Sequence, residues 1–322
     1  MNPAADNLLV VLYARRAYAP LGELADAAGL SLAVVNKALE ALRQRGVMVE
    51  VSPAGLRLAR PVGLDAHLIE HGLDTRRVGR NAIVFGEVES TNDVALDSAR
   101  QANADGLVVL AESQRAGRGR LGRRWTSPPA SNVLMSVLLL DEPAKLSGEA
   151  LTLAAGLAVA EAIERTVPVA PQLKWPNDVL IDDAKVCGIL VEVRRHPRRA
   201  VVVGVGINVN ATPPPEALTR RATCLADHAQ SPIERIDLIR DVLRTLDAWV
   251  GHITDDETDE VTQYLHDQWL ARCGMMNQRI TVRAAGQRFT GRVLDIDPLE
   301  GLILQTDTGQ QLRLPAATSS VE

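Results

Sequence analysis

Hydrophobic residues recur along the chain with two different periods, and the changes between them divide it into three regions. Apolar residues three and four positions apart predict helices in residues 1–62. Residues 83–272 combine continuous apolar runs of strand length with long amphipathic helices. Residues 273–322 alternate apolar and polar positions in short runs. The pattern predicts an α+β chain of three units, with residues 63–82 as a linker that lacks clean periodicity.

The first unit has the pattern of a winged helix-turn-helix. A first helix begins at Leu8. A second helix over Leu21–Ala28 is stopped by Gly29, and Ser31 is placed to cap a third that runs to about Arg45. Two short runs around a Ser-Pro-Ala-Gly turn then predict a hairpin. This order predicts DNA binding by the third helix, with Ser31, Asn36 and Lys37 close to the DNA.

The alternative is that this unit binds another protein, or that it is a vestigial module that no longer binds DNA. Leu32 stands where an arginine would suit the start of a recognition helix. Residues 1–62 hold seven basic and five acidic residues, a net charge of +2. Because phosphate contacts supply most of the affinity for DNA, so small a charge predicts that tight binding needs a dimer.

A cationic loop follows the apolar strand Leu107–Ala111. It has three glycines, which let a backbone approach a ligand closely, and Glu112 as its one acid. The arginine guanidinium is a planar, permanent cation that matches carboxylate and phosphate oxygens. We therefore expect the loop to hold an anion, and a solvated or nucleic-acid-binding loop is the alternative. Its five arginines are Arg115, Arg118, Arg120, Arg123 and Arg124.

Further polar groups lie where apolar runs turn. Ser90, Thr91 and Asn92 follow a predicted strand at 83–88, where capping of the next helix is favoured over a ligand site. Pro176 interrupts the extended run 173–181. The bend that it makes would gather three polar side chains, Lys174, Asn177 and Asp178.

The next two predicted strands carry a lysine and several glycines. Lys185 opens a strand to about residue 193, and Gly188 would let a ligand lie against its backbone. The strand at 201–210 contains a Gly-x-Gly sequence without the third glycine and the helix of a dinucleotide site, so we exclude that fold. Asn208 and Asn210 on the same strand offer amides to a ligand. Two amphipathic helices, near 233–250 and 258–270, complete the central region.

Composition narrows the functional classes. The net charge of −5 argues against nucleic-acid binding over the whole surface, and nine aromatic residues are few for a base-stacking surface. The three cysteines, Cys187, Cys224 and Cys273, have neither disulfide nor zinc-site spacing, which is typical of a reducing compartment. No apolar run reaches eighteen residues, and the chain begins without a signal-peptide pattern. We expect a cytoplasmic protein without a membrane partner.

Four motifs occur in the order found in biotin–protein ligases. They are Gly117-Arg-Gly-Arg-Leu-Gly122, Lys174-Trp-Pro-Asn-Asp178, Lys185-Val-Cys-Gly-Ile-Leu190 and Gly204-Val-Gly-Ile-Asn208. With the winged helix, the whole chain resembles the bifunctional ligases that also repress the biotin operon. The resemblance implies a winged helix-turn-helix at 1–62, a central mixed-sheet α/β catalytic domain related to class II aminoacyl-tRNA synthetases at 83–272, and a C-terminal SH3-like β-barrel at 273–322.

The resemblance also implies a two-step reaction. Biotin is joined to the α-phosphate of ATP to give biotinyl-5'-AMP, and biotin then passes to one lysine of the biotin carboxyl carrier protein of acetyl-CoA carboxylase. Two anions must meet in the first step, so cations are needed to hold them in line, with Mg²⁺ on the phosphates. The resemblance implies two further partners. One is operator DNA of the biotin genes, and the other is a second copy of the chain, with which the chain forms a homodimer when biotinyl-5'-AMP is bound.

Site residues follow from the same resemblance. The implied catalytic residues are Lys185, Arg118, Arg120 and Asp178. The implied biotin site comprises Ser90, Thr91, Asn92, Gln114, Arg118, Gly119, Arg120, Lys185 and Gly188. The implied ATP site comprises Arg120, Arg123, Lys174, Asn177 and Asn208, and no metal ligand is assigned.

Three alternatives stay open. The first is a ligase whose winged helix does not bind DNA. The second is a transcription factor that senses a metabolite without catalysis, against which Lys185 and the two loop arginines argue. The third is a lipoate ligase, against which the Lys-Trp-Pro-Asn-Asp sequence and the winged helix argue.

Overall fold

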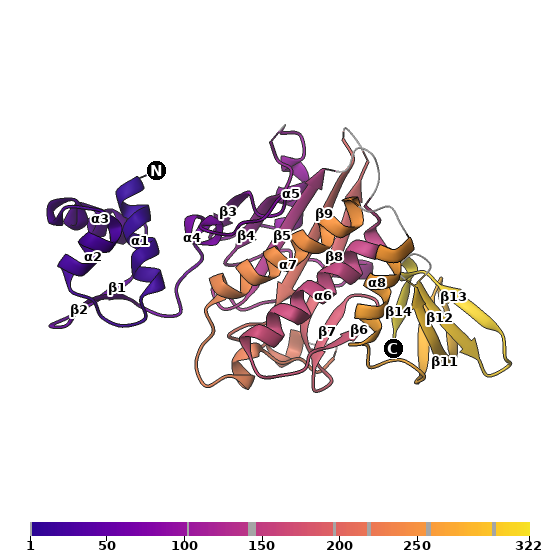
Figure 1. Ribbon diagram of the computed structural model, residues 1–322. Coiled ribbons are helices and arrows are strands. Elements are labelled where there is room, and N and C mark those ends of the chain that lie inside the picture. The colour runs from indigo at the N-terminus through magenta and orange to yellow at the C-terminus, as the bar shows by residue number, and fades with distance from the viewer. Residues whose placement is uncertain are drawn as a thin grey trace.

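The structure is a computed structural model that describes residues 2–101, 103–140, 146–195, 198–217, 220–255, 259–297 and 301–322. Figure 1 shows a small helical unit at the N-terminus, a central sheet crossed by long helices, and a second sheet at the C-terminus. None of the described helices combines the length and apolar character that a membrane crossing requires.

The N-terminal unit contains three helices and a hairpin, as the sequence predicts. The elements are α1 (Pro3–Ala14), α2 (Leu21–Ala28), α3 (Leu32–Gln44), β1 (Val49–Ser52) and β2 (Gly55–Leu58). Gly29 ends α2 with a φ of 65°, and the Ser31 hydroxyl accepts a hydrogen bond from Val34 N at the start of α3. Val34, which the apolar stripe of α3 would bury, is 37% exposed, and Leu32 is 53% exposed.

The connector contains one short helix, α4 (Ala66–Glu70), at a brief amphipathic stretch of its sequence. Ion pairs and hydrogen bonds fasten the first unit to the central one. Glu234 accepts from Arg60 Nη1 at 2.9 Å and from Val62 N at 3.0 Å. Tyr13 Oη donates to Asp237 Oδ1 at 2.8 Å. The first unit therefore docks on the N-terminal end of α7 (Arg235–Asp255).

The central unit is a seven-stranded mixed sheet with the order β3-β4-β5-β9-β8-β7-β6. Only β3 and β4 run parallel among its neighbouring described strands. The strands are β3 (Asn81–Phe85), β4 (Leu107–Ala111), β5 (Val133–Leu140), β6 (Gln172–Lys174), β7 (Asp178–Ile181), β8 (Ala184–Arg194) and β9 (Ala200–Ile207). Strand β9 ends at Ile207, before the predicted end at residue 210, and beyond it Asn208 N donates to Val186 O of β8.

Side-chain alternation gives this sheet two different faces. Val201, Val203 and Val205 of β9 join the main core with α6 (Gly148–Thr166), which lies across the sheet beside α7 (Figure 1). Val202 packs instead with α5 (Thr91–Ser98) on the opposite face. That second face is only partly covered by α5, and Gly204 and Gly206 continue it.

The C-terminal unit follows α8 (Asp259–Leu270), the second predicted amphipathic helix, whose predicted first residue, Thr258, lies outside the described residues. The unit is a five-stranded antiparallel sheet with the order β13-β12-β11-β10-β14. Its strands are β10 (Arg279–Ala284), β11 (Gln287–Asp297), β12 (Gly301–Thr306), β13 (Gln311–Leu314) and β14 (Ser319–Val321). The sequence did not predict β14, because a three-residue strand has no periodicity of its own and is defined by its pairing with β10.

Short 3-10 helices lie at Arg120–Gly122, Pro215–Ala217, Leu225–His228 and Ala316–Thr318.

Candidate active site

The floor of the candidate site is a glycine stripe on the second face of the sheet. Gly188 of β8 pairs directly with Gly206 of β9, and Leu190 pairs with Gly204. A Cβ atom on Gly206 would lie 2.5 Å from the Trp125 indole, and one on Gly188 would lie 2.8 Å from it. The indole of Trp125 therefore lies flat on a surface that only glycine leaves free.

One end of the cavity is a buried polar network at the start of α5. Gln114 Oε1 accepts from Thr91 N at 2.7 Å and from Thr91 Oγ1 at 3.1 Å. Ser136 Oγ lies 2.7 Å from Thr91 Oγ1 and 2.6 Å from Asn92 Oδ1. Ser90 occupies the N-cap position, but its side chain makes no capping hydrogen bond, so the capping interpretation of Ser90 is wrong. The Gln114 side chain accepts the hydrogen bond from the first turn of α5 instead, through Thr91 N.

The cationic loop folds back as an irregular hairpin beside the cavity. Trp125 N donates to Gly117 O at 2.9 Å, and Gly119 N donates to Arg123 O at 2.7 Å. Gly117 has no room for a Cβ atom, which would lie 2.5 Å from Trp125 O. Of the three loop glycines only Gly122 has a positive φ, at 73°.

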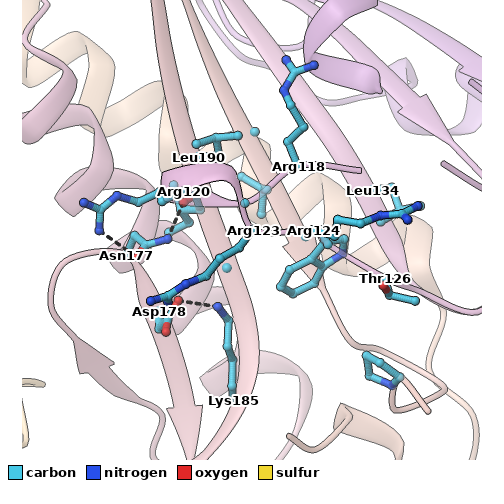
Figure 2. A pocket seen from close by; sticks show the side chains of 18 of the residues that line it. Arg118, Arg120, Arg123, Arg124, Thr126, Leu134, Asn177, Asp178, Lys185 and Leu190 are labelled. Atoms are coloured by element: carbon cyan, nitrogen blue, oxygen red, sulfur yellow. Dashed lines mark hydrogen bonds and ion pairs between the residues drawn. The ribbon is translucent and has the colours of Figure 1, made fainter. Parts of the chain in front are cut away.

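The two central arginines of the loop point in different directions. Arg120 Nη1 donates to Asn177 Oδ1 at 3.3 Å, and its Nη2 donates to Ser319 O at 3.1 Å and also to Ala316 O. Burial lowers the pKa of Arg120. Figure 2 shows the Arg118 guanidinium directed away from Asp178 and Lys185. A bond to Asp93 of α5 and another to Glu192 of β8 raise the pKa of Arg118.

The predicted bend brings a lysine and a carboxylate together. Lys174 pairs with Asp178 across the β6–β7 hairpin, whose loop contains a cis Trp175–Pro176 bond. Asp178 Oδ1 accepts from Lys185 Nζ at 2.5 Å (Figure 2), and its Oδ2 lies 4.0 Å from Arg220 Nη1. Asn177 Nδ2 donates to Ile189 O at 2.7 Å, which fixes its amide toward Arg120. Burial, and next the charge of Arg220, lower the pKa of Lys174.

The far end of the cavity carries an orphaned acceptor. Asn208 is 1% exposed, and its Nδ2 donates to Thr223 O at 3.1 Å. Its Oδ1 is buried and has no hydrogen-bond partner among the described residues. A buried carbonyl oxygen without a donor is costly, so a ligand N–H is the partner that this geometry fits.

The structure thus brings most of the predicted residues around one cavity of about 380 Å³. The predicted residues that line it are Ser90, Thr91, Asn92, Gln114, Arg118, Gly119, Arg120, Arg123, Asn177, Asp178, Lys185, Gly188 and Asn208. Lys174 is not among the lining residues, and the predicted ligand amide of Asn210 is instead bonded at both ends to the backbone of Ile233. Ser31, Asn36 and Lys37 lie elsewhere, exposed on α3.

Four residues in or beside the candidate site were not predicted from the sequence. Trp125 and Arg220 line the cavity, whereas Ser136 and Glu192 stand behind it and hold Asn92. Ser136 is a single polar residue in an otherwise apolar strand, and that pattern was a usable signal. Within the described residues no three His, Cys, Asp or Glu side chains are grouped as a metal site would require.

The chain is similar to known proteins in sequence and in fold. Residues 84–210 match the biotin/lipoate A/B protein ligase family. The chain is 33% identical to the bifunctional ligase/repressor BirA of Bacillus subtilis, over 89% of each chain. It is 36% identical to the biotin–[acetyl-CoA-carboxylase] ligase of Mycobacterium tuberculosis, over 68% of this chain and 80% of the other. The structure of a biotin protein ligase from Aquifex aeolicus in complex with biotin and ATP is similar, with 27% identity, a TM-score of 0.64, and coverage of 76% of this chain and 99% of that one. On these grounds the chain belongs to the BirA family of bifunctional ligase/repressors, within the biotin/lipoate A/B protein ligases.

Proposed function

We propose that this protein is an ATP-dependent biotin–protein ligase. It forms biotinyl-5'-AMP from biotin and ATP and transfers biotin to a specific lysine of the biotin carboxyl carrier protein of acetyl-CoA carboxylase. One arrangement carries the proposal: a single cavity has a neutral hydrogen-bonding end, a cationic middle and an orphaned amide oxygen at its other end. Family membership and the similarity to the biotin- and ATP-bound enzyme support it.

The polar end at α5 suits the ureido ring of biotin, a neutral group with both donors and an acceptor. Thr91, Asn92 and Gln114 supply donors and acceptors there and are held by one another. Gly188 and Gly206 let the Trp125 indole lie close to the strands, which leaves room in the cavity for a flat, largely apolar ring system beside it. Ser90 and Gly119 complete this end of the cavity.

The cationic middle suits the reacting groups. Lys185 lies where the carboxylate of biotin and the α-phosphate would meet, and its bond to Asp178 holds the ammonium in place. Arg120 supplies a second cation, and Arg118 a third if the loop rearranges on ligand binding. Positioned cations offset the repulsion between the two anions and stabilise the charge that develops in transfer.

The orphaned acceptor suits the nucleotide. Asn208 Oδ1 would accept from the exocyclic amine of adenine, while Asn177, Arg123 and, through its charge, Lys174 would act at the ATP end. Mg²⁺ would neutralise the phosphates when bound. Asp178 is the acidic residue among those that line the cavity and would hold the ion, since Mg²⁺ commonly takes only one or two protein carboxylates.

Transfer assays test the ligase directly. Purified protein, biotin, ATP, magnesium and a biotin carrier domain should yield biotinylated carrier, and Lys185→Ala should lose about 10²–10³-fold in rate. Lys37→Ala, a lysine change outside the cavity, should keep the wild-type rate. Lipoate in place of biotin tests the lipoate ligase alternative. Failure of the wild type to form any acyl-adenylate would overturn the proposal.

We further propose that residues 1–62 form a winged helix-turn-helix and residues 273–322 an SH3-like barrel, with the catalytic domain at 83–272. The glycine-turn between α2 and α3, the capped α3 and the β1–β2 hairpin support the first assignment. The five short antiparallel strands, in the order β13-β12-β11-β10-β14, support the second. The first unit would make the protein a biotin-responsive repressor of biotin genes, reading DNA through Ser31, Asn36 and Lys37 as an adenylate-bound homodimer.

Charge in the first unit makes this repressor proposal testable. Most of its arginines are already paired, for example Arg57 with Glu50 at 2.8 Å and Arg45 with Asp6 at 2.5 Å. The binding of each monomer to the DNA upstream of biotin genes is therefore expected to depend only weakly on salt. The logarithm of the binding constant should fall with the logarithm of the salt concentration, with a slope of about −0.9 for each phosphate neutralised. Titration should show tighter binding, and mass measurement a dimer, when biotin and ATP are added. No binding at low salt with both ligands would favour a ligase without a repressor role.

A further inference from the structure

One carboxylate outside the cavity lining, Glu192, links two parts of the candidate site. It lies on β8, on the same face as Gly188 and Leu190, just beyond the polar end of the cavity. Its Oε2 accepts from Asn92 Nδ2 at 2.6 Å and from Arg118 Nη2 at 2.9 Å. One oxygen thus joins the start of α5 to the cationic loop.

Asn92 depends on Glu192 for its orientation. The Asn92 side chain is 4% exposed, and Ser136 Oγ meets its other end at 2.6 Å. Without Glu192, the nearest remaining acceptor for Asn92 Nδ2 is Leu190 O at 3.5 Å. A buried amide donor left with so poor a bond would let the carboxamide turn and disturb Thr91 and Gln114 through Ser136.

Arg118 is held by two carboxylates rather than left free for a ligand. Its Nη1 donates to Asp93 Oδ2 at 2.6 Å, in addition to the bond with Glu192. Such charge-assisted bonds fix a guanidinium in direction. All three side chains keep 31–45% of their surface exposed, so water competes with the bonds and they can open.

We propose that Glu192 is a positioning residue. It acts as a latch that joins Arg118, near the centre of the cationic loop, to the biotin-binding end of the cavity. Through Arg118 it holds the loop so that Trp125 lies on the glycine floor and Arg120 faces Asn177. Through Asn92 it orients the groups that would meet the ureido ring. The effect of the latch on biotin rests on the proposed function, whereas the latch itself rests on the contacts alone.

Loop opening can be measured without any ligand, because trypsin cleaves after arginine and the loop offers five, Arg115, Arg118, Arg120, Arg123 and Arg124. In the full chain, Glu192→Ala is expected to speed cleavage in the loop at least about fivefold. Glu89→Ala is the matched control, since Glu89 pairs with Arg115 of the same loop at 2.9 Å but both side chains are 61% exposed. Cleavage of this control is expected at the wild-type rate. Cleavage of Glu192→Ala at the wild-type rate would overturn the latch.

Kinetics then separate positioning from a general loss of structure. Glu192→Ala is expected to raise the KM for biotin about tenfold and to release more biotinyl-5'-AMP into solution when no acceptor is present. Arg118→Gln, which leaves β8 and Asn92 intact, is expected to increase release with a smaller change in KM. Arg118→Gln also provides the measurement if Glu192→Ala does not fold. Equal losses of kcat, without a KM change or release in either variant, would contradict the positioning role.

The two proposals fail in different ways. A wild-type protein that forms no adenylate removes the ligase function, and trypsin cleavage still decides whether Glu192 latches the loop. If the wild type forms the adenylate normally and trypsin cleaves Glu192→Ala at the wild-type rate, only the proposal that Glu192 is a latch is overturned.

Discussion

Gly188 and Gly206 lie side by side on neighbouring antiparallel strands, and the indole of Trp125 covers both of them. The two residues are eighteen positions apart in the sequence. Their pairing makes one smooth patch in a sheet whose other face is filled with valines. Neither glycine has a positive φ, so it is the space above them, not backbone conformation, that requires glycine.

Gly206→Ala should therefore impair the site. Its methyl group would lie 2.5 Å from Trp125 Cε2, and overpacking of this kind costs about 1–3 kcal/mol. We expect kcat/KM for biotin to fall roughly 5- to 150-fold. The control is Gly251→Ala in α7, where nothing lies within 4 Å of the added methyl and helix propensity favours alanine. Wild-type activity in Gly206→Ala would show that Trp125 does not cover this floor.

Asn208→Ala should weaken ATP binding and leave biotin binding unchanged. The variant removes the orphaned Oδ1 acceptor, and a single neutral hydrogen bond contributes about 0.5–1.5 kcal/mol. This corresponds to a rise of roughly two- to twelvefold in the KM for ATP. Asn210→Ala is the control, because both ends of that amide are bonded to Ile233 and it lies outside the cavity lining. Equal effects of the two changes on ATP would count against adenine recognition by Asn208.

Glu234→Ala should loosen the N-terminal unit. The Glu234 side chain is 8% exposed and joins Arg60 and Val62 N, so its removal leaves a largely buried cation and a backbone donor without their acceptor. Arg60 is 20% exposed and keeps its bond to Tyr13 O, so we expect a loss of roughly 3 kcal/mol, the lower end for a broken buried pair.

The midpoint of urea unfolding of the full chain measures this loss. Glu23→Ala provides the comparison, because the pair of Glu23 with Arg15 is 58% and 39% exposed and contributes at most about 1 kcal/mol. Similar midpoints for the two variants would mean that Glu234 does not fasten the units.

The three cysteines should resist thiol reagents in the native protein. Burial raises the pKa of the Cys187 and Cys224 thiols, and it raises the pKa of Cys273 to about 11. A raised thiol pKa lowers the thiolate fraction at any pH below it. At pH 8 only about 0.1% of Cys273 is then thiolate, against about 25% for a free cysteine. We expect modification to take hours natively and minutes in denaturant; rapid native labelling of any cysteine would contradict these positions.

Local chemistry predicted much of the first unit and of the cationic loop. The glycine after α2, the Ser31 cap of α3 and the strand before the loop all follow from short-range rules, because they depend on neighbouring residues. The four motifs also gave half of the cavity lining, including Lys185 and Asp178. The direction of Arg118 could not be predicted, since the carboxylates that hold it come from α5 and β8.

The sequence alone determined the order of most helices and strands, the family and the residue types that can bind a vitamin acid and a nucleotide. Tertiary structure decided which groups face each other. It paired Gly188 with Gly206, placed Ser136 and Glu192 behind Asn92, joined Arg120 to the C-terminal strand region and left Asn208 Oδ1 without a partner. The physical reason is that helices and strands form through contacts within a few residues, whereas strand register and side-chain pairing join segments tens to nearly two hundred residues apart.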